Sequence, residues 1–73
     1  MINQQDVELK FRLIDIISVL SINYDAKIGV NGNFVGQFSI RDIPYRYLNL
    51  YVKCIYPLYN GEKQYTGIDL VGK

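Results

Sequence analysis

The residues of this chain that could carry out chemistry are few, and the most versatile type is absent. The 73 residues include no histidine and a single cysteine, Cys54. A nucleophile needs an adjacent base, and histidine is the usual one. Without histidine, the relays that depend on it and the mixed cysteine and histidine zinc sites are excluded. We therefore expect no catalytic residue, no metal and no cofactor.

The remaining candidates for chemistry have structural explanations. The seven Asp and Glu side chains are scattered, and no spacing singles out a pair for acid and base catalysis as in glycosidases. Gly29, Gly32 and Gly36 lack the Gly-Lys-Ser/Thr ending and the following helix of a phosphate-binding loop. Cys54 is expected on the core side of a strand, where apolar surroundings make a thiol inert. The sequence thus predicts a protein that is not an enzyme.

A tyrosine-rich stretch is the best candidate for binding. Residues 45–56 read as one strand, whose side chains alternate between a core side that carries Leu50, Val52 and Cys54 and an opposite side. Tyrosine combines a large apolar ring with a polar tip, as recognition surfaces do. In the alternative interpretation, the N-terminal segment covers this side and the tyrosines form a second core layer. The predicted partner-binding residues are Tyr47, Asn49, Tyr51 and Lys53, joined by Tyr65 from the last strand.

Charge favours a protein partner over nucleic acid. Eight Lys and Arg oppose seven Asp and Glu, a net charge of +1, so no basic stripe for phosphate binding is evident. Arg41, Arg46 and Lys53 interleave with tyrosines over residues 41–53, which resembles the pattern of single-strand nucleic-acid binders. Alternation, however, puts Arg46 on the side of Leu48, away from those tyrosines. A single-stranded nucleic-acid-binding β-domain is therefore the alternative function.

The length predicts a single domain over residues 1–73 with modest stability, because a domain of this size buries only about 60% of its unfolded surface. One cysteine cannot form an internal disulfide, which leaves oligomerisation, most simply a dimer, as the expected support. No apolar run of membrane-spanning length and no signal peptide are found, and a free cysteine favours the cytoplasm. These features favour a non-enzymatic interaction or inhibitor module, as a phage, virus or mobile element would use against a host protein.

The N-terminal third decides the fold class. Residues 6–13 alternate strictly between apolar and polar side chains, and residues 14–22 are apolar on both sides, which predicts strands. A helix over residues 4–22 is the alternative, because the stretch contains no glycine or proline. The first interpretation gives an all-β fold, a small antiparallel sandwich or barrel of four to five strands. The second gives an α+β fold, with helix 4–22 packed on a three- to four-stranded antiparallel sheet.

Two hairpins are expected in the remainder of the chain. Around Asn31-Gly32-Asn33, a three-residue loop with Asn33 left-handed would pair Val30 with Phe34 and gather the large apolar side chains on one face. After a corner at Pro44, the strand that starts at residue 45 is expected to end at Pro57. A turn over residues 59–62 leads to a last strand over residues 63–71. In that strand, Thr66, Ile68 and Leu70 share one side, and Tyr65, Gly67 and Asp69 share the other.

The first hairpin resembles a known module. The segment Ile28-Gly29-Val30-Asn31-Gly32-Asn33-Phe34-Val35-Gly36, followed by Pro44 before the next strand, is similar to the hairpin of PEGA-type β-modules. The threonine-proline pair and glycine-tyrosine ending of that family are absent. The resemblance implies an antiparallel β-fold and assigns no functional residue.

Overall fold

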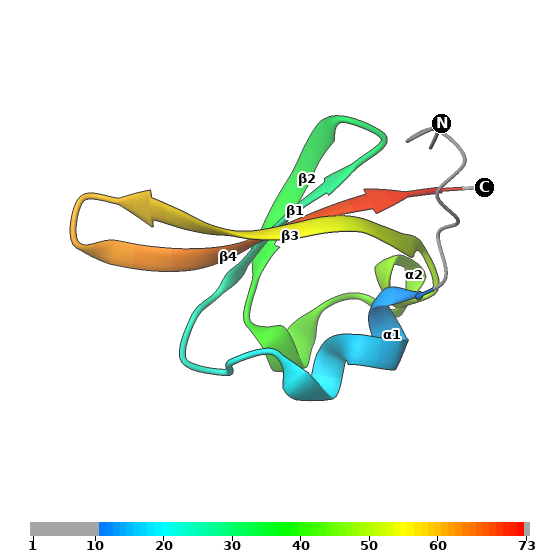
Figure 1. The fold of residues 1–73 in the computed structure, drawn as a ribbon, viewed down its shortest axis with the longest axis horizontal. Coiled ribbons are helices and arrows are strands. Elements are labelled where there is room, and N and C mark those ends of the chain that lie inside the picture. The colour runs from blue at the N-terminus through cyan, green and yellow to red at the C-terminus, as the bar shows by residue number, and fades with distance from the viewer. Residues whose placement is uncertain (1–10, 73) are drawn as a thin grey trace, which may run out of the picture.

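A four-stranded sheet covered on one side by short helical turns forms the body of the protein (Figure 1). The structure is a computed structural model, and it describes residues 11–72. The strands are β1 (Ala26–Val30), β2 (Asn33–Phe38), β3 (Tyr51–Asn60) and β4 (Lys63–Val71). The helical layer consists of α1 (Leu13–Ile16) and the 3-10 turn η2 (Ile17–Val19), and of the 3-10 turn η3 (Ile40–Asp42) and α2 (Tyr45–Leu48).

The sheet is mixed, with strand order β2-β1-β4-β3. Two antiparallel hairpins, β1 with β2 and β3 with β4, meet through a parallel pairing of β1 with β4. Parallel neighbours require a crossover connection, and η3 and α2 lie within it. The prediction of a sheet-rich fold is confirmed. The prediction of a wholly antiparallel sheet was wrong, because the central strands β1 and β4 pair in parallel. The sheet is open rather than closed into a barrel, with β2 and β3 at its edges.

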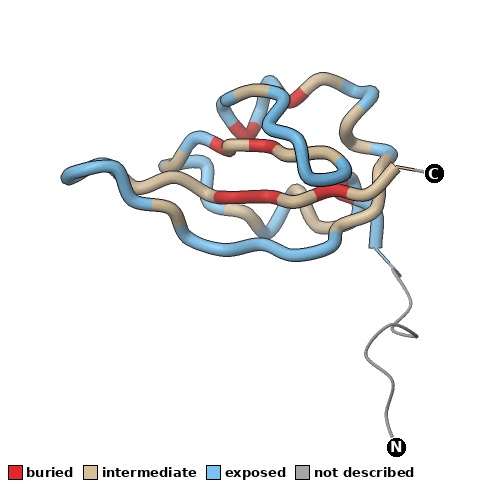
Figure 2. The backbone as a smooth tube through the Cα atoms, turned by 90° about the horizontal axis from the view of Figure 1, so that it is seen from above, coloured by how far each residue is buried: buried red, intermediate tan, exposed pale blue. Residues whose placement is uncertain are grey.

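The core lies between the two central strands and the helical layer. Alternation along β1 and β4 directs one set of side chains toward that layer, and the two strands carry most of the buried stretches in Figure 2. The outer strand β3 is largely exposed over residues 53–57. The buried residues are Leu13, Ala26, Ile28, Ile40, Ile43, Ile68 and Leu70.

The strand predicted for residues 14–22 was wrong, because α1 and η2 occupy residues 13–19. The N–H of Leu13 donates to the carbonyl of Leu50 at 2.9 Å, which ties the start of α1 to the chain before β3. Residues 11–13 still pair with the start of β3, through an antiparallel Arg12–Tyr51 bridge and a hydrogen bond from the Val52 N–H to the carbonyl of Phe11 at 2.8 Å. The chain turns helical from Leu13, which is fully buried. Of the alternative helix predicted over residues 4–22, the described residues contain only α1 and η2. The part of both predictions that concerns residues 4–10 lies outside them.

The first hairpin adopts the shorter of its two registers. Val30 pairs with Asn33 across a two-residue Asn31-Gly32 loop, in which φ is 52° at Asn31 and 88° at Gly32. Positive φ at both positions is the requirement of a type I′ turn, which matches the twist of the flanking strands. The predicted three-residue loop was therefore wrong. Phe34 consequently pairs with Gly29, on the side of the sheet away from the core.

The stretch predicted as one strand from residue 45 contains a turn of helix and a bulge. Tyr45–Leu48 form α2, directly after Pro44, and β3 begins only at Tyr51 and continues through Pro57 to Asn60. Val52 pairs with Leu70 and Cys54 with Asp69, so Lys53 is an extra residue in the strand. A bulge of this kind reverses which side of the sheet the later residues face.

Candidate functional site: the open face of the sheet

The side of the sheet opposite the core carries the candidate site, which we call the open face. Its residues come from all four strands and fall into two neighbouring rows across the sheet. The first row, from β2 to β3, consists of Phe34, Gly29, Asp69 and Cys54. The second consists of Gln37, Lys27, Gly67 and Tyr56. Leu58 and Tyr65 continue the face toward the tip of the β3–β4 hairpin.

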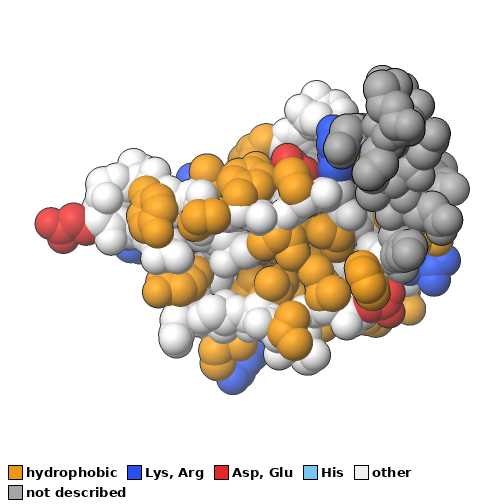
Figure 3. All heavy atoms as spheres, in the orientation of Figure 1, with side chains coloured by type: hydrophobic (Ala, Val, Ile, Leu, Met, Phe, Trp, Pro, Cys, Tyr) orange, Lys and Arg blue, Asp and Glu red, His pale blue; other side chains and the backbone are white. Residues whose placement is uncertain are grey.

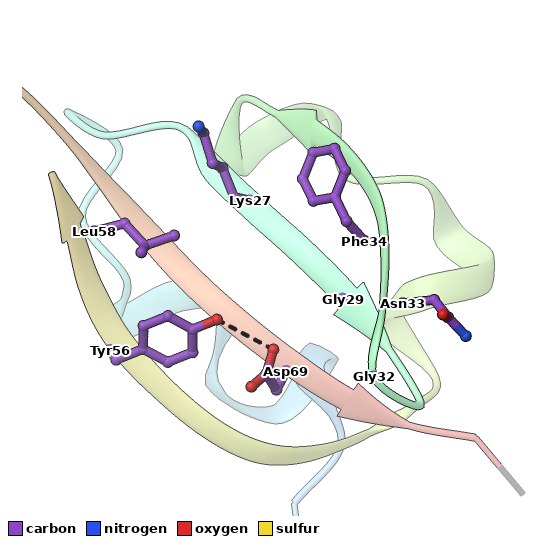
Figure 4. Close-up of a pocket in the computed structure, with 8 residues that line it drawn as sticks. All are labelled: Lys27, Gly29, Gly32, Asn33, Phe34, Tyr56, Leu58 and Asp69. Carbon is purple, nitrogen blue, oxygen red and sulfur yellow. Dashed lines mark hydrogen bonds between the residues drawn. The ribbon is translucent and has the colours of Figure 1, made fainter. Parts of the chain in front are cut away.

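The centre of the open face is flat because the ring of Tyr56 lies over Gly67, which has no side chain. A Cβ added at Gly67 would overlap the ring of Tyr56, which crosses this position from the neighbouring strand. Gly67 is consequently buried although it faces away from the core. Close approach of a neighbour is a common reason for glycine inside a strand. The result is a shallow hollow, lined also by Lys27, Phe34 and Leu58 (Figure 4).

Asp69 is the acceptor at the middle of this face. Its Oδ1 accepts a hydrogen bond from the Tyr56 hydroxyl at 3.2 Å, drawn in Figure 4, and its Oδ2 accepts one from the Cys54 thiol at 3.4 Å. Within residues 11–72 no lysine or arginine forms an ion pair with the carboxylate. Asp69 therefore accepts hydrogen bonds from two neutral donors, and Lys53 lines a hollow beside it.

The same contacts keep the Cys54 thiol protonated. Desolvation by its surroundings, followed by the hydrogen bond to Asp69 and the charge of that carboxylate, raises the pKa of Cys54 above its ordinary value. The pKa of Tyr56 is raised for the same reasons. Since the thiolate is the nucleophilic form, this environment does not activate the cysteine. The prediction that Cys54 is a core residue was wrong, because the bulge at Lys53 places it exposed on the open face.

Lys27 is the cation within the two rows of the open face. Its Nζ lies 4.4 Å from the centroid of the Tyr65 ring, a cation–π geometry. No carboxylate of the described part of the chain pairs with it. One cation and one anion, each without a charged partner among these residues, thus stand on adjacent strands.

Exposed aromatic side chains flank the two charges. Phe34 is 68% exposed and Tyr56 is 36% exposed, and they stand at opposite ends of the two rows. Elsewhere, hydrophobic side chains are visible over the middle of the molecule and along the β3–β4 hairpin (Figure 3), where Tyr59 is 68% exposed. Val19 and Ile22 are exposed on the helical layer. The open face differs from these scattered positions because its aromatics adjoin both charges.

The five predicted partner-binding residues do not share one surface. Tyr47 lies in α2 and packs on the core, with its ring centroid 5.9 Å from that of Phe38. Asn49 ends α2, Tyr51 starts β3, and Lys53 is exposed at the bulge. Tyr65 belongs to the open face. Tyr51 pairs with Val71, two residues beyond Asp69, and so lies on the same side of the sheet at the start of β3. The position of Tyr47 agrees in part with the alternative in which the tyrosines form a second core layer.

The arginines that suggested nucleic-acid stacking lie off the open face. Arg46 in α2 stacks on Tyr47, with Cζ 4.6 Å from the ring centroid. Arg12, which was not part of that predicted pattern, contacts the Tyr51 ring at 5.2 Å and donates to its hydroxyl at 3.3 Å. Arg41 is exposed in η3. These aromatic and basic pairs belong to the helical layer and its junction with β3, so they form no continuous platform with the sheet.

The important residues that the sequence interpretation missed are Lys27, Phe34 and Tyr56. Asp69 was assigned correctly to the side of β4 that also carries Tyr65 and Gly67. The Asn31-Gly32 pair, a typical two-residue turn, was the available signal for the side that Phe34 faces. No local signal marked the bulge that brings Tyr56 to the same side.

No family model, curated protein or solved structure matches the chain. Within residues 11–72, no three side chains of His, Cys, Asp or Glu are grouped so that they could hold a metal ion. The described helices are all too short to cross a membrane. Any functional assignment therefore depends on the geometry of the open face.

Proposed function

We propose that the chain is a non-enzymatic protein-binding module that binds its partner through the open face of the sheet. This proposal rests on the contrast between the two sides of the sheet. In the described residues the helical layer covers one side, while the other presents Phe34 and Tyr56 around a flat centre. Exposed aromatic side chains with few charges are typical of the centre of protein interfaces.

The charges of the open face favour a protein over nucleic acid. Non-specific affinity for nucleic acid comes mainly from neutralising several phosphates. The two rows of the open face contain one cation, Lys27, which already contacts Tyr65, and they place the carboxylate of Asp69 at the centre. A phosphate chain that crossed this face would meet a like charge. A protein surface can supply groups of both signs.

The finer form of the proposal is an inhibitor that covers the surface of a host protein. The small size of the chain, its lack of histidine and its single cysteine support a role that needs contact alone. An accessory protein of a phage, virus or mobile element would be of this kind, a small protein that acts by binding alone. The candidate residues Tyr47, Asn49, Tyr51 and Lys53 would then lie outside the main contact, with Tyr65 at its margin.

A matched pair of surface variants tests the proposal. Phe34 and Tyr59 are both aromatic, both 68% exposed, and Tyr59 lies off the open face because it alternates with Leu58. We expect Phe34→Ser to abolish capture of the partner from an extract of the native cells, and Tyr59→Ser to leave it intact. The reverse pattern would contradict the proposal. Binding of a labelled single-stranded oligonucleotide at low salt, lost in Phe34→Ser, would replace it with the nucleic-acid function.

A further inference from the structure

We infer that the open face also binds a second copy of this chain, docked face to face about a two-fold axis. The inference rests on the proposed function, because it uses the same surface for self-association. In a two-fold interface, the same patch of each copy contacts the other copy. If one residue contacts a second residue across the interface, the same contact forms again with the two copies exchanged. The patch must therefore be complementary to itself.

The four central positions of the open face meet this condition. Lys27 pairs with Gly67 and Gly29 with Asp69 across the parallel β1–β4 ladder. The two charged residues thus occupy one diagonal of a rectangle, and the two glycines occupy the other. The strand spacing and the rise per residue put the Cα atoms of Lys27 and Asp69 about 8 Å apart. Opposite charges on a diagonal are the simplest arrangement that complements itself.

The axis that satisfies both charges lies in the plane of the interface, near the diagonal through the two glycines. Rotation about it places Lys27 of one copy over Asp69 of the other, and the reciprocal pair forms at once. Lys27 and Asp69, neither of which has a charged partner within residues 11–72, thereby each gain one. Closely packed charge pairs of this kind fix the register of an interface more than they raise its affinity.

The aromatic residues fall close to the same axis. Phe34 follows Gly29 in the first row, and Tyr56 follows Gly67 in the second, so the extended glycine diagonal passes near both. Each ring then approaches its own symmetry mate, where aromatic pairs add to the stability of the contact. Strands of the two sheets cross steeply in this arrangement, as in orthogonal sheet packing. The flat centre, where the Tyr56 ring lies over Gly67, permits the close approach.

The size of the face sets the expected strength. Four strands at about 4.8 Å spacing and about 17 Å of strand length give a flat area of roughly 300 Å². An interface of this extent belongs to the small class, below about 1,200 Å² of total buried surface. We therefore expect a reversible dimer that forms in the micromolar to millimolar range rather than an obligate one.

Charge exchange between Lys27 and Asp69 is the direct test, read by sedimentation equilibrium. Lys27→Glu alone and Asp69→Lys alone should each remain monomeric where the unmodified chain dimerises, because each creates two like-charge contacts. An equal mixture of the two variants should form a heterodimer, since every contact then joins opposite charges. The double variant should dimerise with itself. Arg41→Glu, which makes the same charge change on the helical layer, should dimerise as the unmodified chain does.

A second readout needs no substitution and covers the case in which a variant fails to fold. Cys54 is the only thiol and lies on the open face, so its alkylation by iodoacetamide should slow as the protein concentration rises. An unmodified chain that stays monomeric up to millimolar concentration, or a dimer in which Cys54 stays fully reactive, would overturn the inference. A monomer that still binds another protein through Phe34 would overturn the inference and leave the proposed function standing.

Discussion

Two phenylalanines in one strand provide the sharpest test of the two-sided sheet. Phe34 and Phe38 both lie in β2, and the longer hairpin loop would put both in the core. In the structure, Phe38 pairs with buried Ala26 and packs against Tyr47. Phe34 pairs with Gly29 on the open face instead. Substitution of each by alanine should therefore have very different costs.

The expected difference follows from burial. Full burial of a phenylalanine side chain contributes about 1.5–3 kcal/mol, and Phe34 is 68% exposed. About a third of its surface is covered, so Phe34→Ala should lower the free energy of unfolding by less than about 1 kcal/mol. Phe38→Ala removes a ring packed on the core and should cost about 2–3 kcal/mol. The total for a chain of this size is roughly 4–11 kcal/mol, so the second loss is large.

Urea unfolding followed by far-ultraviolet circular dichroism measures both variants. The protein should be kept dilute, because a dimer through the open face would add stability that depends on concentration. Under these conditions the urea concentration at the unfolding midpoint should be nearly unchanged for Phe34→Ala and clearly lower for Phe38→Ala. Equal losses would refute the two-residue register of the first hairpin, and with it the position of Phe34 on the open face.

The other predictions concern the thiol and the helical layer. Asp69→Asn should speed the alkylation of Cys54 several-fold at neutral pH and move the pH profile of the reaction to lower pH, because the carboxylate contributes to the raised pKa of the thiol. The protein should be kept dilute, and Asp42→Asn is the control variant. An unchanged pH profile would contradict the contact between Cys54 and Asp69. Leu13→Ala should cost about 3 kcal/mol of unfolding free energy, and Val19→Ala, at an 80% exposed position, less than about 0.5 kcal/mol. Similar costs in urea unfolding would show that α1 does not pack on the sheet.

The elements that sequence reasoning predicted well are those without local irregularity. In β4 the alternation runs unbroken, so Ile68 and Leu70 face the core and Gly67 and Asp69 face away, as predicted. In β3 the same argument failed after Val52, because one extra residue reverses the assignment for the rest of the strand. Alternation alone cannot show where a bulge lies.

Long-range packing accounts for the remaining differences. The parallel pairing of β1 with β4 joins residues forty positions apart, and no local pattern encodes it. Tyr45–Leu48 have the composition of a strand, yet they form α2, where Tyr47 and Leu48 pack against the core. Tertiary contacts of this kind override weak local propensity. The candidate site could not be predicted for the same reason, since its four strands meet only in the folded sheet.

Protein binding by the open face, with a second copy of the chain as the partner, can be measured without any substitution. The measurement is a dilution series of ¹H–¹⁵N correlation spectra of the unmodified protein. We expect concentration-dependent shifts on the amides around Lys27, Phe34 and Asp69, while those of α1 and η3 stay fixed. Shifts confined to the helical layer, or none up to millimolar concentration, would show that the open face does not bind a second copy.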